Sequence, residues 1–189
     1  MPICLDEQKQ ECEKMNGGSE PAKVIRVCFV CTGNTCRSPM AAAVANAMAK
    51  KYEKILRQKN LPMIEAISAG LYANDGEPIS RHAREALEMS DIQPVKGMDY
   101  RSHTAHTVHT VDVQTSDLLI GLGGGHCMEL MMRFPEVAQK IVGMPEPISD
   151  PYGGNLEVYR ECLSQIADGV RRLLFSSLPE EEREVRNDG

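Results

Sequence analysis

The chain has 189 residues, of which 42% are hydrophobic and 25% are charged, and its formal net charge is −6. This length suits one domain with a substantial core. The negative charge argues against a nucleic-acid-binding surface, and no apolar run is long enough to span a bilayer. We therefore expect neither a nucleic acid nor a membrane as a partner.

The seven cysteines fit neither a disulfide framework nor a zinc site, because no Cys-x2-Cys pair is matched by a second pair. Cys28 and Cys31 have the spacing of a redox motif. Their strand context favours Cys28 as a buried small hydrophobe and Cys31 alone as reactive. We expect reduced thiols and a cytoplasmic protein.

Residues 1–22 are polar and rich in turn-forming residues, and they lack the basic end and apolar stretch of a secretory signal. They are interpreted as a flexible N-terminal extension. Residues 23–178 are expected to form the folded domain, and residues 179–189 a charged C-terminal tail.

The first predicted elements are a strand and a helix joined by a short loop. The apolar run 24–30 predicts a buried strand. The alanine-rich segment from Ser38 to about Arg57 predicts a helix, with Pro39 near its first turn.

The loop between them has the composition of an anion site. Its small and polar residues let the backbone N–H groups point inward, and the start of the helix adds positive potential. Arg37 supplies a planar fork suited to two phosphate oxygens. The same field stabilises a thiolate at Cys31, which would be a nucleophile aimed at phosphorus. Ser38 can hydrogen-bond that sulfur, and Asn34 can bridge the loop backbone.

The sequence Cys-Thr-Gly-Asn-Thr-Cys-Arg-Ser-Pro at 31–39 resembles the phosphate-binding loop of the low-molecular-weight protein tyrosine phosphatases, including their protein arginine phosphatase branch. The alternative, a buried cysteine in an ordinary strand–helix turn, explains neither Arg37 nor the asparagine and serine. The resemblance implies that Cys31 and Arg37 are catalytic. It also implies that the remaining loop residues bind the substrate: Thr32, Gly33, Asn34, Thr35, Cys36 and Ser38.

The segment 63–68 predicts the second strand, which ends in Ser68-Ala69-Gly70. This tripeptide also resembles the family, in which the serine supports the phosphate-binding loop by hydrogen bonding. A simple turn explains it equally well. A helix is expected to follow from Ser80 to Met89.

His103, His106 and His109 recur at a spacing of three, so on a helix they would share one face. No carboxylate or cysteine completes a convincing ligand set, and we expect no metal site.

The segment 116–122 predicts another buried strand, followed by Gly123-Gly124-Gly125. A glycine-rich turn can cradle a nucleotide phosphate, but the Gly-x-Gly-x-x-Gly spacing is absent. A tight turn into a helix that begins near His126 is favoured, with greater mobility at this rim of the pocket. The segment 139–144 predicts a short last strand.

The loop that follows contains Asp150-Pro-Tyr-Gly-Gly, which resembles the general-acid loop of the same family. A leaving group needs a proton as its bond to phosphorus breaks, and a base must later activate water. Asp150 is expected to do both, and Tyr152 to line the pocket and stack on a flat substrate group. The final helix is expected over 156–174.

Strands and helices alternate along the chain. This order predicts an α/β fold in three layers, with a short, mainly parallel sheet of about four strands. The resemblance covers roughly residues 24–175 and implies the phosphotyrosine protein phosphatase I-like fold. The connections that carry Cys31 and Asp150 would then meet at one edge of the sheet.

The expected reaction is hydrolysis of a phosphorylated protein side chain through a cysteinyl-phosphate, without metal or cofactor, because arginine and amide groups supply the positive field. Thr35 resembles the arginine phosphatase branch, since tyrosine-directed members usually have a larger apolar residue there. We favour phosphoarginine over phosphotyrosine, although Tyr152 stands where arginine phosphatases carry phenylalanine.

Two other classes are weaker. An arsenate reductase would need a cysteine pair between Ser68 and Gly125, where none lies, and a non-catalytic phosphate-binding module would show no turnover. Cys36 is a possible redox partner of Cys31.

A monomer or weak homodimer is expected.

Overall fold

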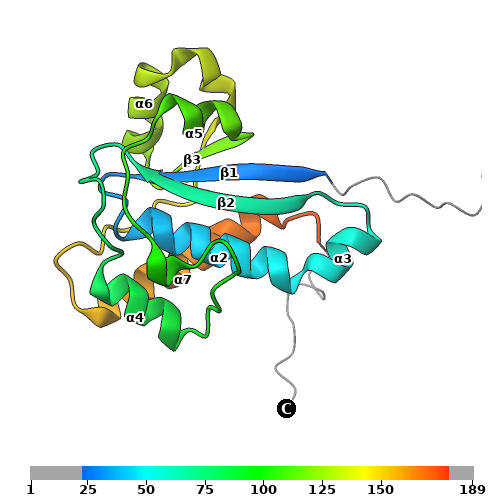
Figure 1. Cartoon of the computed structure of the whole chain (residues 1–189), viewed down its shortest axis with the longest axis horizontal. Coiled ribbons are helices and arrows are strands. Elements are labelled where there is room, and N and C mark those ends of the chain that lie inside the picture. The colour runs from blue at the N-terminus through cyan, green and yellow to red at the C-terminus, as the bar shows by residue number, and fades with distance from the viewer. Residues whose placement is uncertain (1–22, 179–189) are drawn as a thin grey trace, which may run out of the picture.

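The computed structural model describes residues 23–178 (Figure 1). Four strands form one parallel sheet in the order β2-β1-β3-β4. Their bounds are β1 Val24–Cys31, β2 Met63–Gly70, β3 Leu118–Gly121 and β4 Ile141–Gly143. The α-helices are α2 Arg37–Lys51, α3 Glu53–Gln58, α4 Arg81–Met89, α5 Thr110–Thr115, α6 Gly124–Arg133 and α7 Leu156–Leu174, and the 3-10 helices are η1 Tyr100–Ser102 and η2 Pro135–Lys140.

The helices cover both faces of the sheet, which confirms the predicted three-layer α/β architecture. In Figure 1, α5 and α6 lie on one side of the strands, and α2, α4 and α7 lie on the other. The chain leaves β1 through α2 toward β2, and leaves β3 through α6 toward β4 on the opposite edge. The winding direction therefore reverses between β1 and β3, and in open α/β sheets the loops at such a point commonly carry the ligand site.

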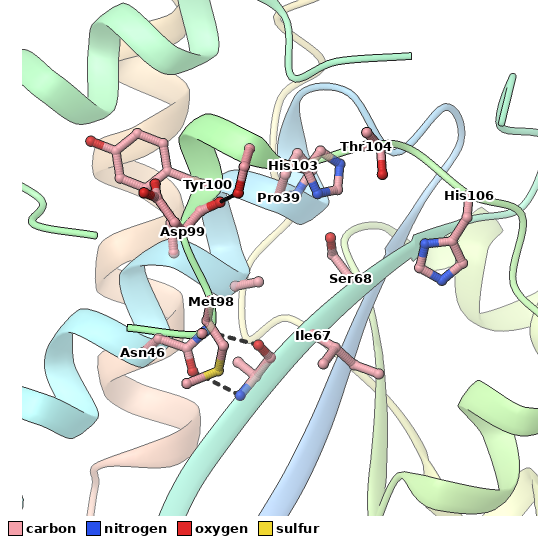
Figure 2. Close-up of a pocket in the computed structure, with 15 residues that line it drawn as sticks. Pro39, Asn46, Ile67, Ser68, Met98, Asp99, Tyr100, His103, Thr104 and His106 are labelled. Carbon is pink, nitrogen blue, oxygen red and sulfur yellow. Dashed lines mark hydrogen bonds between the residues drawn. The ribbon is translucent and has the colours of Figure 1, made fainter. Parts of the chain in front are cut away.

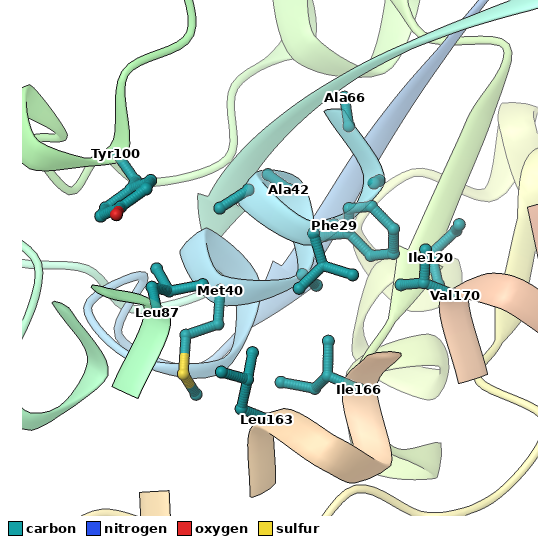
Figure 3. Packing of buried hydrophobic residues seen from close by; sticks show 14 of the residues in the cluster. Phe29, Met40, Ala42, Ala66, Leu87, Tyr100, Ile120, Leu163, Ile166 and Val170 are labelled. Carbon is teal, nitrogen blue, oxygen red and sulfur yellow. The ribbon is translucent and has the colours of Figure 1, made fainter. Parts of the chain in front are cut away.

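The central strand β1 supplies both halves of the core, because successive side chains point to opposite faces. Phe29 packs with Met40, Ile120 and Ile166 on the α2 and α7 side (Figure 3). Its neighbour Val30 packs on the side of α5 and α6. This double burial accounts for the unbroken apolar run in the sequence.

The predicted single helix from Ser38 to Arg57 is wrong in one respect, because it is broken at Tyr52. Tyr52 has φ −90° and ψ 3°, and it both ends α2 and precedes α3. Its ring is buried and lies 5.4 Å from the ring of Phe175, centroid to centroid. The break turns α3 away from the axis of α2 (Figure 1).

The three histidines do not share a helix face. The segment between η1 and α5 is largely extended, and it bonds to the end of β2 through Gly70 N to His106 O at 2.9 Å and Val108 N to Gly70 O at 2.7 Å. Helix α5, which begins one residue after His109, was not predicted. Among residues 23–178, no group of histidine, cysteine, aspartate and glutamate side chains could hold a metal ion.

The remaining strands and α4 and α7 lie where the sequence places them, with β3 and β4 shorter than predicted. The 3-10 helices η1 and η2 were not predicted, and α6 begins at Gly124, inside the predicted glycine turn. Ser80 caps α4 by accepting a hydrogen bond from Ala83 N. The predictions for residues 1–22 and 179–189 fall outside the described residues. Within 23–178, no helix is both long and apolar enough to cross a membrane.

Candidate active site

Most of the predicted site residues meet in a pocket of about 360 Å³ at the carboxyl end of β1. Asn34 and Ser38, predicted to bind the substrate, are instead fully buried and do not line it, and neither does Ser68. The loop of residues 31–37, called the phosphate loop below, forms its floor. Cys31 is the last residue of β1 and Arg37 is the first of α2, so the strand and the helix fix both ends of the loop. The lining residues are Cys31, Thr32, Gly33, Thr35, Cys36, Arg37, Tyr72, Asn74, Glu77, Asp150 and Tyr152.

The three predicted catalytic side chains are brought together although they come from distant segments. Cys31 Sγ lies 3.0 Å from Ser38 Oγ, a distance at which the serine hydroxyl can donate to a thiolate. Arg37 Nη2 donates to Asp150 Oδ2 at 2.6 Å across 113 positions of sequence. Arg37 is buried, whereas the Asp150 side chain is 54% exposed and can reach a bound substrate.

Asn34 holds the curl of the phosphate loop. It is fully buried and has a positive φ of 56°. Its Nδ2 donates to Ser38 Oγ and to Ser68 Oγ, both at 3.0 Å, and its Oδ1 accepts from His106 N at 3.0 Å. His103 Nε2 donates to the Asn34 carbonyl at 2.8 Å, and burial lowers the pKa of that imidazole. This geometry favours a Ser68 that supports the phosphate loop by hydrogen bonding over a simple turn at this position.

The thiol of Cys36 is held in a polar network behind the pocket. It donates to Ser80 Oγ at 3.3 Å, and Tyr159 OH lies 3.3 Å from the same sulfur. Burial, together with this contact, raises the pKa of Tyr159 to about 12. The network ties the phosphate loop to α4 and α7. Neither Ser80 nor Tyr159 was among the predicted site residues.

The sequence did not identify the turn that forms one wall of the pocket. Tyr72, Asn74 and Glu77 lie on the turn after β2, where Gly76 has φ +89°. Asn74 Nδ2 donates to Glu77 Oε1 at 3.0 Å, so the carboxylate is oriented. The sequence shows only that these residues follow a predicted strand; that this strand ends beside β1 is known from the structure.

Tyr152 also lines the pocket, and His126 contacts one of its lining residues. Tyr152 is 83% exposed, and its backbone N–H donates to Asp150 Oδ1 at 3.2 Å. His126 Nε2 lies 3.2 Å from Thr32 Oγ1. The sequence predicted a turn near His126 but not this contact with the phosphate loop.

A second hollow of about 320 Å³ lies behind the phosphate loop (Figure 2). Pro39, Ser68, Tyr100 and His103 are among its lining residues, whereas Cys31, Arg37 and Asp150 are not. The hollow therefore borders the residues that support Asn34 and takes no part in forming the reacting pocket.

The arrangement is suited to transfer of a phosphoryl group. A cysteine lies at the start of a loop whose amides lead into a helix N-terminus, an arginine closes the loop, and a carboxylate reaches over it. These groups supply a nucleophile, an electrostatic cradle and a proton donor.

Comparison with known proteins agrees with this geometry. Residues 26–185 match the model of a family described as low molecular weight phosphotyrosine protein phosphatase. A protein-arginine-phosphatase of Geobacillus stearothermophilus is 34% identical over 155 residues, which are 78% of this chain and 93% of that protein. A low molecular weight protein-tyrosine-phosphatase of Staphylococcus epidermidis is 27% identical over 157 residues, covering 80% and 98%.

Solved structures show the same similarity. The low molecular weight protein tyrosine phosphatase from T. tengcongensis superposes with a TM-score of 0.70 at 34% identity, covering 80% of this chain and 99% of that one. The YwlE arginine phosphatase from Geobacillus stearothermophilus has a TM-score of 0.66 at 29% identity, covering 87% and 99%.

Proposed function

Because the chain belongs to the low molecular weight phosphotyrosine protein phosphatase family, we propose that Cys31, Arg37 and Asp150 carry out its reaction on phosphorylated protein side chains. The protein is a cysteine-dependent phosphatase, as its relatives are. The observation that carries the assignment of residues is the convergence of these three side chains on one pocket.

In the first step Cys31 attacks phosphorus, while the loop amides and Arg37 bind the equatorial oxygens. Asp150 gives a proton to the leaving group as the bond to phosphorus breaks. The Ser38 hydroxyl lies 3.0 Å from the sulfur and donates to the Ala69 carbonyl at 3.2 Å; turned toward the sulfur instead, it would stabilise the thiolate before attack and after release. In the second step Asp150 takes a proton from water, which attacks the cysteinyl-phosphate and releases phosphate.

Phosphoarginine is the favoured substrate. Thr35 presents a small hydroxyl-bearing side chain in the pocket, where an aromatic leaving group would gain from a larger apolar one. Two carboxylates, Asp150 and Glu77, line the same pocket and suit a cationic guanidinium. The Geobacillus relative is named a protein-arginine-phosphatase, which supports the same choice. Tyr152, exposed at the rim, is the feature that suits phosphotyrosine.

The proposal is tested by the ratio of kcat/KM on phosphoarginine to kcat/KM on phosphotyrosine. We expect the parent to prefer phosphoarginine and Thr35→Ile to shift the ratio toward phosphotyrosine by at least about tenfold, roughly the effect of one or two apolar methyl contacts. A parent that strongly prefers phosphotyrosine would refute the choice of substrate.

The second carboxylate is tested separately with Glu77→Gln. We expect it to lower kcat/KM on phosphoarginine about threefold to tenfold, and to leave hydrolysis of the uncharged phosphotyrosine ring unchanged or faster. Glu136→Gln is the matched control, because it removes the same charge from an exposed residue outside the pocket. Equal effects of the two variants would exclude a role for Glu77.

A phosphate-binding module without catalysis is the second candidate. In that case the parent would not turn over any aryl phosphate, whereas Cys31→Ser would bind phosphate as the parent does. The proposed enzyme predicts turnover in the parent and none in Cys31→Ser, with phosphate binding retained.

Cys36 is proposed to protect the nucleophile by forming a disulfide with Cys31 under mild oxidation. Peroxide oxidises one thiol to a sulfenic acid with release of water, and the other thiol then attacks the sulfenic sulfur, which forms the S–S bond, breaks the S–O bond and releases a second water. Peptide mapping after peroxide treatment should show a Cys31–Cys36 linkage, and its absence would rule out this role.

We also propose a cytoplasmic location and a monomeric or weakly dimeric state. The five cysteines among residues 23–178 are all free thiols, as a reducing compartment favours. Sedimentation of the whole chain over a concentration series measures the oligomeric state.

A further inference from the structure

The segments that follow β1 and β3 are joined by a side-chain contact. Thr32 directly follows β1, and His126 lies in the first turn of α6, which follows β3. Their side chains meet with His126 Nε2 at 3.2 Å from Thr32 Oγ1, although 94 positions separate them in the sequence. Thr32 is the residue next to the nucleophile, and it lines the catalytic pocket.

The surroundings of His126 determine which ring nitrogen carries the proton. The residue is 9% exposed, and its Nδ1 is buried without a hydrogen-bond partner among the described residues, facing Gly123. A proton on Nδ1 would be a buried donor with no acceptor. With the hydrogen on Nε2, Nδ1 is an unpaired acceptor, which buried sites tolerate more often than an unpaired N–H, and Nε2 can donate to Thr32.

The charged groups near the ring also favour its neutral form. Burial lowers the pKa of His126, and the nearby Arg37 guanidinium lowers it further. The Asp150 carboxylate acts in the opposite sense, but its effect is the smallest of the three. The imidazole is therefore a neutral donor at neutral pH.

When a hydroxyl oxygen accepts a hydrogen bond from one side, its own hydrogen must point to another side. With the ring hydrogen on Nε2, Thr32 Oγ1 is the acceptor in the 3.2 Å contact and its own hydrogen must point elsewhere; Thr32 is exposed and lines the pocket. We propose that His126 is a positioning residue that orients the Thr32 hydroxyl as a hydrogen-bond donor to a phosphoryl oxygen of the substrate. This inference rests on the proposed function and adds a side-chain donor to the backbone amides of the phosphate loop.

The test compares His126→Ala, His126→Gln, Thr32→Val and the double variant His126→Ala/Thr32→Val. p-Nitrophenyl phosphate is the substrate, and inorganic phosphate is the ligand for a binding measurement that needs no turnover. Thr32→Val and His126→Ala should each lower kcat/KM and phosphate affinity about tenfold, as expected for one hydrogen bond to a charged group. His126→Gln keeps an amide donor at similar reach and should stay within about threefold of the parent.

The double variant decides between positioning and independent structural effects. If His126 acts through Thr32, the double variant should be no weaker than Thr32→Val alone. Additive losses, or a loss in His126→Gln equal to that in His126→Ala, would overturn the inference. His109→Ala is the control, since it removes an exposed imidazole outside the pocket.

A spectroscopic measurement tests the inference without relying on catalysis. The long-range proton–nitrogen spectrum of the parent at pH 7 should show His126 neutral, with its hydrogen on Nε2. A hydrogen on Nδ1 would refute the proposed orientation of Thr32. A parent without turnover would refute the proposed function instead, and phosphate binding by Thr32→Val would still test the Thr32 donor.

Discussion

At the scale of single residues, Asp150 holds its loop in place and is also the proposed proton donor. Its carboxylate pairs with Arg37 at 2.6 Å and also accepts from the backbone of Tyr152. Both contacts hold the loop before α7 over the pocket. Half of the side chain stays exposed, which lets the same carboxylate reach a leaving group.

The proposed role of Asp150 as a proton donor predicts that its effect depends on the leaving group. Asp150→Asn should lower kcat/KM on phosphotyrosine by at least about 100-fold, the usual contribution of a general acid. The loss on p-nitrophenyl phosphate should be smaller, because nitrophenolate leaves without a proton. Steady-state kinetics on the two substrates measures both values.

Glu146→Gln is the control for Asp150→Asn. Glu146 lies in the same connection, and its side chain is 70% exposed. It should leave both rates close to those of the parent. Equal losses on both substrates in Asp150→Asn would mean that the carboxylate acts through the loop structure and not by donating a proton.

At the scale of elements, the phosphate loop depends on a segment that has no regular structure of its own. The extended stretch between η1 and α5 provides the His103 side chain and the His106 backbone that bind Asn34. The same stretch bonds to the end of β2. The loop is therefore held from behind, which lets its amides face the pocket.

Asn34→Ala tests this support. The change removes three side-chain hydrogen bonds at a buried position with positive φ, so the free energy of unfolding should fall by about 2–4 kcal/mol. Urea denaturation measures the loss, and phosphate affinity should fall with it.

Asn60→Ala is the matched control, because Asn60 also has a positive φ, of 51°, but is exposed. It should cost no more than about 1 kcal/mol. If the two variants lose the same free energy of unfolding, backbone strain and not the hydrogen bonds would explain the effect of Asn34.

Most elements were predictable because their periodicity is strong. The apolar run 24–30 is typical of a central strand buried on both faces. The predicted bounds of the last helix are the observed bounds of α7. The break at Tyr52 could not be foreseen, since it depends on packing against Phe175, far along the chain. The extended form of the histidine segment could not be predicted for a related reason: it depends on pairing with Gly70, and a spacing of three carries no information about tertiary pairing.

At the scale of the whole molecule, the site is assembled from four connections on one edge of a parallel sheet. Cys31, Arg37 and Asp150 were predictable because their local motifs are specific. The positions of Glu77 and His126 were not predictable, because they depend on which loops the sheet order β2-β1-β3-β4 places beside the phosphate loop.

Two imidazoles, the partly buried His103 and the buried His126, make the stability of the whole domain depend on pH. Burial lowers the pKa of His103 and of His126 below the ordinary value of about 6.5. As pH falls below about 6.5 the unfolded chain takes up protons first, so stability is full above that pH and is lost as pH falls through the two folded-state values. Urea midpoints at pH 7.5, 6.5 and 5.5 should decrease in that order.

The double variant His103→Gln/His126→Gln is the comparison for this measurement. It should be less stable at pH 7.5 but should lose less between pH 7.5 and 5.5. The carboxylates with lowered pKa values titrate below this range and do not mask the effect. A parent midpoint that is unchanged or rises toward pH 5.5 would contradict the prediction.

The central position of β1 has a consequence for folding kinetics. This strand pairs with β2 on one side and β3 on the other, and both partners lie far along the chain. Local helix formation can proceed before these pairings close, because contacts of long sequence separation form slowly. The phosphate loop takes its shape only after both pairings exist. The recovery of enzymatic turnover during refolding therefore reports closure of the sheet, and it should lag behind the recovery of helical circular dichroism.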